Sequence, residues 1–265
     1  IRHSNEDGIC DISMDRAKIM VPSVHGWQRD ETGKWLYMID DSNKIGYIRI
    51  SSFNARTADD LEEALTQLEE IGLKGLILDL RFNPGGLLSA AVEITDKFIS
   101  EGLMLRTQPR CGVSAYISAH KEGTYRDCPI VVLVNQFTAS ASEILAGVLQ
   151  DPKYKRAILV GQRTYGKGSV QSIMNCSDKG TQLKYTAAFY HLPSGQRVES
   201  RDFVEKLGRI DWGISPDVEV VLHSDELQRI ADTQKANECL ITKRQENNIS
   251  GTNRHSSMDT VNSDP

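Results

Sequence analysis

The sequence lacks any apolar run close to the roughly 20 residues that a membrane-spanning helix needs. It also lacks a secretory leader, because residues 1–7 are polar and the first residue is Ile rather than Met. We therefore expect a mature or trimmed product with no membrane span in this chain. Its compartment cannot be read from its first residues.

Neither a basic surplus nor a metal motif is present. The net charge is −5 and the pI is near 5.7, which disfavours nucleic acid as a partner because phosphate binding needs clustered Lys and Arg. The five cysteines are scattered and form no C-x-x-C pair. Cys111 and Cys128 either pair in an oxidising compartment or remain free thiols. No His, Cys, Asp and Glu group has metal-ligand spacing, so the sequence predicts no metal site.

What the chain does contain is an alternation of strand and helix patterns. Short apolar or alternating runs predict strands, and apolar residues at helical spacing predict the segments between them. The strands are expected at 44–50, 75–80, 130–134 and 157–160, and the helices at 57–71, 87–98 and 140–150. Thr57 and Asp60 have the spacing of a capping box at the first helix. This order indicates an α/β core with parallel pairing.

The end of the chain differs in composition. Residues 243–265 are rich in Asn and Ser and nearly free of large apolar side chains. Such a segment cannot repay the entropy of ordering, so residues 223–265 are expected to be a polar and largely disordered tail. Leu227 and Ile230 predict one short surface helix at its start.

Ser140 lies where a buried strand ends and a helix begins, within the stretch TASASE (138–143). Unpaired amides and the helix dipole favour negative charge there, so the Ala141 amide is placed to stabilise an oxyanion on a carbonyl attacked by Ser140. The alternative is that Ser140 is a plain helix cap.

Lys167 lies between two glycines, which permit close backbone approach. In an apolar pocket such a lysine loses solvation, and its neutral amine becomes available as a base. Gln171, four residues on, can orient the amine or the serine. The alternative is a surface turn. A phosphate-binding loop is excluded because Gly168, not Ser or Thr, follows the lysine.

Gly85 and Gly86 follow the strand at 75–80 and expose backbone amides at a turn, so they are candidates for the second oxyanion donor. The alternative is a turn with glycines for steric reasons alone. Histidine is the usual base for a serine nucleophile. None of the six histidines lies in a turn of this kind, and His25 and His191 are better explained as strand-end residues. Lys167 is therefore the better candidate.

Together these places resemble the carboxyl-terminal processing peptidases, also called tail-specific proteases. The resemblance rests on five ordered stretches, which are GYIRISSF (46–53), GLILDLRFNPGG (75–86), VVLVNQFTASASEILAG (131–147), GQRTYGKGSVQ (161–171) and GISPDVEV (213–220). It implies Ser140 as nucleophile, Lys167 as base and Gln171 in support. The implied oxyanion donors are the amides of Ala141 and of the Gly85–Gly86 turn.

The resemblance also implies a fold and a domain plan. The expected fold is an α/β, Clp protease/crotonase-like core of stacked ββα units, with additional β-structure near 169–192 and 213–221. Residues 26–222 form the protease core in this plan, and residues 1–25 are a leading segment that resembles the end of a truncated PDZ domain.

The implied activity is that of a serine endopeptidase that cuts unfolded or flexible proteins near their C-terminus, through an acyl-enzyme and without a cofactor. Its partners are protein or peptide substrates, which pair with a strand edge near 184–189. An exported or cell-envelope location follows from the resemblance alone. The alternatives are a non-catalytic binding module on the same scaffold and a crotonase-like acyl-CoA enzyme, which would not pair a serine with a lysine. The sequence leaves the oligomeric state open.

Overall fold

The computed structural model describes residue 15 and residues 21–125, 128–177 and 180–238. The leading segment therefore lies largely outside the described residues, as do residues 239–265 of the polar tail. No helix in the described part of the chain is long and apolar enough to cross a membrane.

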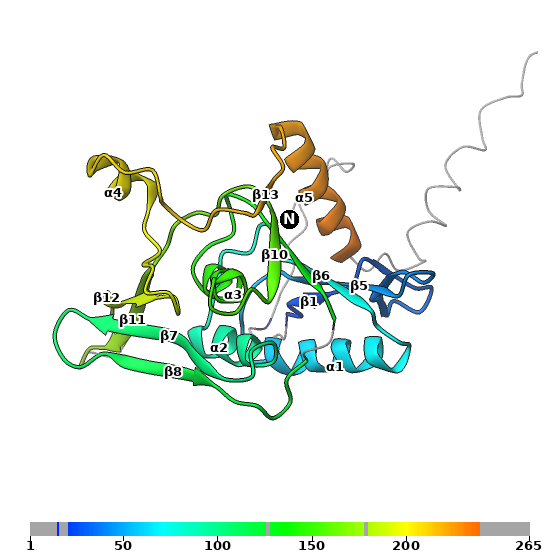
Figure 1. Ribbon diagram of the computed structural model, residues 1–265, viewed down its shortest axis with the longest axis horizontal. Helices are drawn as coiled ribbons and strands as arrows, with labels where there is room; N and C mark the ends of the chain where they lie inside the picture. Colours follow the sequence, from blue (N-terminus) through cyan, green and yellow to red (C-terminus); the bar gives the residue numbers. More distant parts are fainter. Residues whose placement is uncertain (1–14, 16–20, 126–127, 178–179, 239–265) are drawn as a thin grey trace, which may run out of the picture.

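The centre of the molecule is a seven-stranded sheet in the order β1-β5-β6-β9-β10-β13, with β4 beside β5. The strands β5, β6, β9, β10 and β13 are parallel, whereas β1 and β4 run antiparallel to β5. Their bounds are β1 Val24–His25, β4 Met38–Asp40, β5 Ile45–Ile50, β6 Gly75–Asp79, β9 Ile130–Val134, β10 Ala157–Gly161 and β13 Val218–Glu219. The predicted α/β core with parallel pairing is therefore confirmed (Figure 1).

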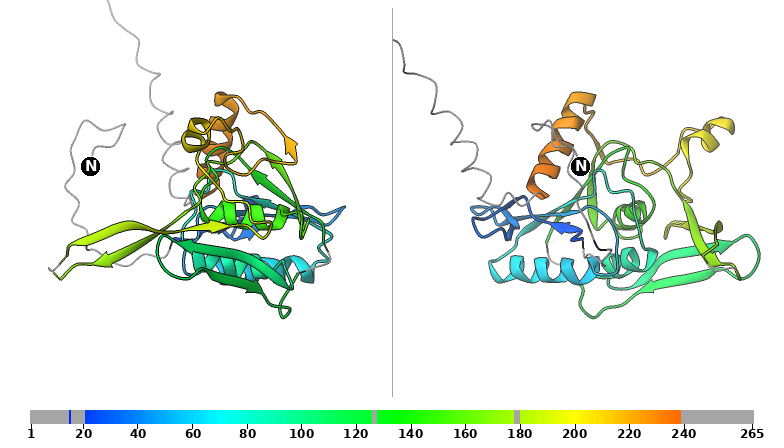
Figure 2. Two further views of the ribbon diagram at one scale, coloured as in Figure 1. Left: turned by 60° about the vertical axis from the view of Figure 1, so that its left-hand side comes forward. Right: turned by 180° about the vertical axis from the view of Figure 1, so that it is seen from behind.

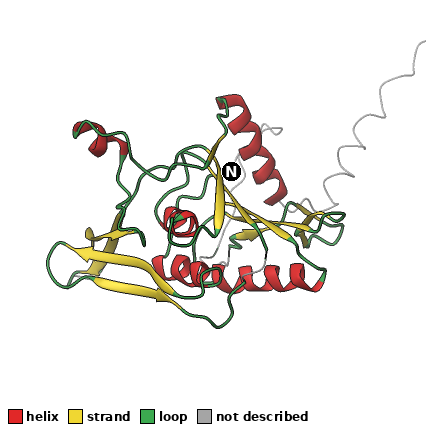
Figure 3. Cartoon of the chain, in the orientation of Figure 1, coloured by secondary structure: helices red, strands yellow, loops and turns green. Residues whose placement is uncertain are grey.

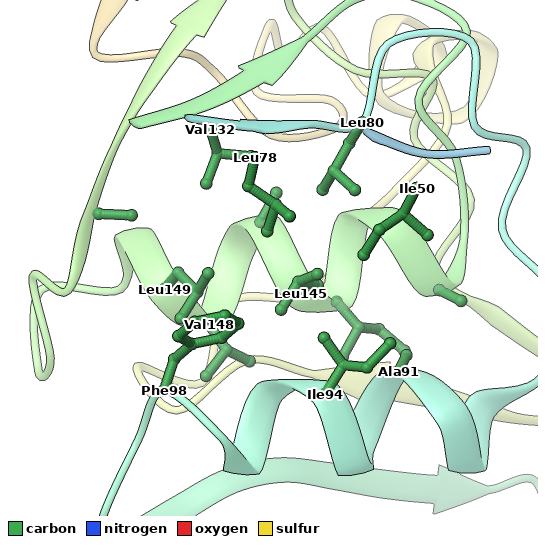
Figure 4. Packing of buried hydrophobic residues seen from close by; sticks show 14 of the residues in the cluster. Ile50, Leu78, Leu80, Ala91, Ile94, Phe98, Val132, Leu145, Val148 and Leu149 are labelled. Atoms are coloured by element: carbon green, nitrogen blue, oxygen red, sulfur yellow. The ribbon is translucent and has the colours of Figure 1, made fainter. Parts of the chain in front are cut away.

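Three helices, α1 (Thr57–Glu70), α2 (Leu88–Asp96) and α3 (Ala141–Gln150), pack on one face of this sheet (Figure 3). Figure 4 shows α3 between the sheet and α2, with Leu145 and Leu149 among the packed side chains. Ala141 to Leu149 are all buried. A helix covered on every side is held rigidly by packing, and α3 is the helix that begins beside Ser140.

The capping box expected at the first helix is absent. Thr57 is the first residue of α1, and its hydroxyl accepts from the Asn54 amide upstream instead of an amide within the helix. Asp60 pairs with Arg56, the residue before the helix. Its carboxylate does not accept from the Thr57 amide, as a capping box would require. Thr57 is fully buried against Ser23, and this tertiary hydrogen bond replaces the local cap.

A second sheet of four antiparallel strands has the order β11-β12-β7-β8. Its strands are β7 Gly102–Pro109, β8 Ala115–Ala119, β11 Ser169–Asn175 and β12 Gln182–His191. The hairpin of β11 and β12 projects from the body of the molecule (Figure 2). A small ribbon pairs β2 (Gln28–Arg29) with β3 (Trp35–Leu36), and a short helix, α4, spans Arg201–Lys206. Cys111 and Cys128 are free, so the disulfide alternative is wrong.

The helix α5, Ser224–Glu238, is longer than the short helix predicted at the start of the tail. It has no buried residue and lies across the sheet from α1 and α2 (Figure 1). Its contacts are polar: Glu238 pairs with Arg49, and the Gln234 amide donates to Asp79 at 3.3 Å. Because these contacts are polar, hydrophobic periodicity could not reveal the length of the helix.

His25 on β1 predicts how stability depends on pH. Its side chain is buried and its Nε2 lies 3.0 Å from the Ser51 hydroxyl. Burial and the charges of Arg49 and Arg29 lower its pKa to about 3. The unfolded chain binds this proton near pH 6.5, so the contribution is complete above that pH and declines as pH falls toward 3.

We therefore expect His25→Gln to remove a slope of up to about 1.4 kcal/mol per pH unit below pH 6.5 in the free energy of unfolding. Urea unfolding at pH 7 and pH 5, for the parent and the variant, measures this slope. His120→Gln, at an exposed imidazole, is the control. Equal losses of stability in parent and His25→Gln between the two pH values would contradict the expectation.

Candidate active site

Ser140 occupies a strained turn between β9 and α3. Its backbone has φ 59° and ψ −116°, a conformation that a residue with a side chain rarely adopts. Such strain costs on the order of 1–3 kcal/mol and persists only where the surroundings enforce it. Here the Ala139 amide donates to the Asn83 carbonyl at 3.0 Å, and the Thr138 hydroxyl donates to the Leu80 carbonyl at 2.9 Å. The turn after β9 is thereby fastened to the turn after β6.

The neighbouring serine has a structural position. Ser142 is fully buried, and its hydroxyl donates to the Asn83 carbonyl at 3.0 Å. Ser140 is half-buried and lines a pocket of about 440 Å³. Of the two serines, Ser140 is therefore the one that a bound molecule can reach.

Glu143 was not predicted from the sequence and is the main anchor of the site. It is fully buried in the first turn of α3, where Oε2 accepts from the amides of Ser140 and Lys167, both at 2.8 Å. Oε1 accepts from the Gly166 amide at 2.7 Å and the Thr164 hydroxyl at 2.5 Å. One carboxyl group thus joins the backbones of the two candidate catalytic residues.

Burial raises the pKa of the Glu143 carboxyl above its usual value, and the hydrogen bond from Thr164 and the three amides act in the opposite direction. All four partners are donors, which suits a carboxylate rather than a carboxylic acid. The available sequence signal was the Ser-x-x-Glu spacing of Ser140 and Glu143, the pattern of a capping box at the start of α3.

The Lys167 loop explains its two glycines. A Cβ at Gly166 would overlap the Glu199 carbonyl, and one at Gly168 would overlap the Val198 carbonyl. The Tyr190 hydroxyl donates to the Lys167 carbonyl at 3.0 Å. The backbone of Lys167 is therefore fixed on both sides, whereas its side chain is half-buried and lines the same pocket as Ser140.

The turn after β6 supplies the opposite wall of the pocket. A Cβ at Gly85 would lie 2.8 Å from the Ser140 Cβ, so only glycine fits there, and φ is +97°. The Gly85 amide donates to the Asn83 Oδ1 at 2.8 Å and is occupied. Among the described residues, the amides of Gly86 and Ala141 have no hydrogen-bond acceptor. These two amides are therefore available to a ligand.

Gln171 lies on β11 at a register shift and lines the pocket with an exposed side chain. Within the described part of the chain, no hydrogen bond joins the Ser140 hydroxyl, the Lys167 amine and the Gln171 amide. The pocket has no acidic lining residue, and a second lysine, Lys184, contributes to its wall. The structure thus brings all six predicted site residues to one pocket.

The predicted strand edge near 184–189 is correct only in part, because among the described residues Lys184 to Ala187 have no partner on the β7 side, whereas Ala188 and Phe189 do. β12 pairs with β7 from Ala188 to His191 and is an inner strand there. The edge strand on the pocket side of this sheet is β11, whose residues Ser169, Val170, Gln171 and Ile173 contribute to the pocket wall. An extended peptide next to Ser140 would therefore meet β11 rather than residues 188–189.

Comparison with known proteins identifies the family of this chain. The family model described as Peptidase family S41 matches residues 44–220. The carboxyl-terminal-processing protease of Synechocystis sp. is 48% identical over 158 residues, which cover 58% of this chain and 36% of that protein. The carboxy-terminal processing protease CtpA of Bacillus subtilis is 36% identical over 195 residues, or 73% of this chain and 38% of that protein. The chain thus spans less than two fifths of the length of these two relatives.

Solved structures support the fold. The photosystem II D1 C-terminal processing protease has a TM-score of 0.59 and 29% identity, covering 85% of this chain and 56% of that one. Mature CPAF has a TM-score of 0.55 at 14% identity, covering 78% and 52%, and bears on the fold alone. The predicted Clp protease/crotonase-like core with added β-structure is confirmed. Because the family model covers more than half of the sequence, the chain belongs to peptidase family S41.

Proposed function

We propose that this chain is the catalytic part of a serine endopeptidase that uses Ser140 as nucleophile and Lys167 as general base. The observation that carries the proposal is the shared pocket: a serine on a strained turn, a half-buried lysine and two unoccupied amides face one space. The Glu143 carboxylate accepts from the amides of Ser140 and Lys167 and so fixes both backbones. Acyl transfer needs catalytic groups that are held in place in this way.

In the proposed reaction the Lys167 amine accepts the proton from Ser140 as the serine oxygen attacks the peptide carbonyl. The amides of Gly86 and Ala141 stabilise the oxyanion, whereas the Gly85 amide stays bound to Asn83. The lysine then protonates the leaving amine, and an ester forms at Ser140. The same lysine takes a proton from water as the water attacks the ester, and it returns that proton to the Ser140 oxygen as the acid product leaves and ionises. Gln171, on the rim, helps to orient the lysine or the substrate. No step requires a cofactor.

The substrate we propose is an unfolded or flexible protein that is cut near its C-terminus. The names of the relatives support the position of the cut. The exposed outer edge of β11 supports an extended substrate, because a strand can add to it through main-chain hydrogen bonds. An exported or cell-envelope location belongs to the same proposal, and membership of peptidase family S41 supports it.

Digestion of casein followed by acid quenching tests the proposal. Mass spectrometry should find new peptides and an acyl adduct on the fragment that contains Ser140, because the ester is a covalent intermediate. An adduct on another residue would exclude Ser140 as nucleophile. Neither cleavage nor an adduct, with casein retained by the protein, would favour the non-catalytic binding module.

A further inference from the structure

A second groove of about 420 Å³ lies along β12, separate from the Ser140 pocket. We call it the β12 groove. The lining residues that matter here are Gln108, Arg110, Thr186, Phe189, His191 and Arg197. Phe189 and His191 pair across the strands with Gln108 and Arg106, and such partners share one face of a sheet. Tyr190, between them, points to the other face and contacts Lys167.

The β12 groove is cationic. Arg110 and Arg197 line it, and Arg106 lies across from His191. The Arg197 guanidinium stacks on the Phe189 ring with 3.8 Å between its carbon and the ring centroid. The carboxylate next to Arg197 is that of Glu199, which also forms an ion pair with Arg209, with 3.0 Å between Arg209 Nη1 and Glu199 Oε2. The arginines therefore keep an excess of positive charge for a bound group.

Two polar atoms in this groove are buried without a partner. Neither His191 Nδ1 nor Arg197 Nε has a hydrogen-bond partner within the described residues. Glu199 Oε1 lies 3.5 Å from Arg197 Nε, which is an ion pair but not a hydrogen bond. The other guanidinium nitrogens of Arg197 have no hydrogen bond among the described residues, and because this side chain is 35% exposed, they are the donors that a ligand with acceptor atoms would meet.

The backbone beside these atoms is also unpaired. β12 pairs with β7 only from Ala188 onward, so Gln182 to Ala187 have no strand partner on that side within the part of the chain that the structure describes. The pairing with β11 slips at the same place, because Val170 faces Ala188 while Gln171 faces Thr186. An exposed edge of this kind accepts an extended peptide through main-chain hydrogen bonds.

We propose that the β12 groove binds an extended, acidic peptide segment. Its backbone lies along the unpaired edge of β12, and its carboxylates meet the guanidinium groups of Arg110 and Arg197 beside the His191 ring. Alternate residues of an extended chain point to the same side, so acidic residues at every second position fit best. This site is distinct from the pocket of the proposed cleavage, and its occupancy does not depend on catalysis.

Fluorescence anisotropy with the full chain carrying Ser140→Ala measures this binding. The probe is an N-terminally labelled, C-terminally amidated peptide of four Ala-Glu repeats, and its partner replaces every Glu by Gln. We expect the Glu peptide to bind at least tenfold more tightly. Arg110→Gln, at an exposed residue that leaves folding intact, should weaken it about threefold to fivefold. Arg197→Gln should weaken it about tenfold or more, because its guanidinium is partly buried.

Arg201→Gln is the matched control, since it removes one arginine outside the groove that pairs with Glu205. It should leave the affinity unchanged. Equal affinity for the two peptides, or no effect of Arg110→Gln, would overturn the proposal. So would a loss of binding in Lys184→Gln alone, which would place the peptide in the Ser140 pocket. Displacement by equimolar inorganic phosphate would show a site for free oxyanions instead of a peptide.

Discussion

Lys167→Met is expected to lower kcat/KM for peptide hydrolysis by on the order of 10⁴-fold, because members of a catalytic unit depend on one another. The anchors of this residue are its amide and its carbonyl, bound to Glu143 and Tyr190. The side chain can therefore be removed while the loop keeps its place, and the loss should appear in kcat. Steady-state hydrolysis of a casein-derived peptide measures it.

Two further variants identify the chemistry of that loss. Lys167→Arg keeps a positive charge but should be equally inactive, because a guanidinium stays protonated and cannot act as base. Lys184→Met, at the second lysine of the pocket wall, should cost less than about tenfold. If Lys167→Arg retained more than about a hundredth of the parent rate, Lys167 would contribute charge rather than proton transfer.

Glu143→Gln should lower the free energy of unfolding by about 2–4 kcal/mol, because an amide nitrogen would replace an oxygen that only accepts. With either orientation of the glutamine, at least one of the amides of Ser140, Gly166 and Lys167 faces a donor and stays unsatisfied. Activity should fall as well, since both catalytic backbones lose their common anchor. Urea unfolding gives the first quantity and peptide hydrolysis the second.

Glu93→Gln provides the comparison for this variant. Glu93 is exposed on α2, and its replacement should change the free energy of unfolding by no more than about 0.5 kcal/mol. Unfolding curves of Glu143→Gln that coincide with those of the parent would mean that the carboxylate does not hold the site.

The parts that could be predicted from the sequence are those that repeat locally. Short continuous apolar runs predict buried strands, as at Gly75–Asp79 and Ile130–Val134. The change to helical spacing of apolar residues after Ser140 predicts α3. The candidate residues were found because glycines and small side chains surround them. The physical reason is close packing, because a Cβ at Gly85 would overlap Ser140 and a Cβ at Gly168 would overlap the Val198 carbonyl.

The remaining features depend on contacts between distant segments. No local pattern in the sequence predicts that the Glu143 carboxylate accepts hydrogen bonds from Thr164 and Lys167, which lie more than 20 residues later. The Thr57 hydroxyl forms a hydrogen bond with the Ser23 hydroxyl, a distant residue, instead of capping its own helix. The order of β11, β12 and β7 likewise reflects pairing across the chain, which periodicity within one strand cannot encode.

One of these distant contacts has a consequence for biosynthesis. The Ile214 amide donates to the Thr164 hydroxyl at 2.7 Å, and the Thr164 amide donates to the Ile214 carbonyl at 3.0 Å. Thr164 in turn binds Glu143, so a residue 50 positions downstream completes the support of Ser140 and Lys167. A nascent chain that has not yet emerged past Ile214 holds every candidate catalytic residue without this clamp. The site is therefore expected to become rigid only after the ribosome has released the segment that contains Ile214.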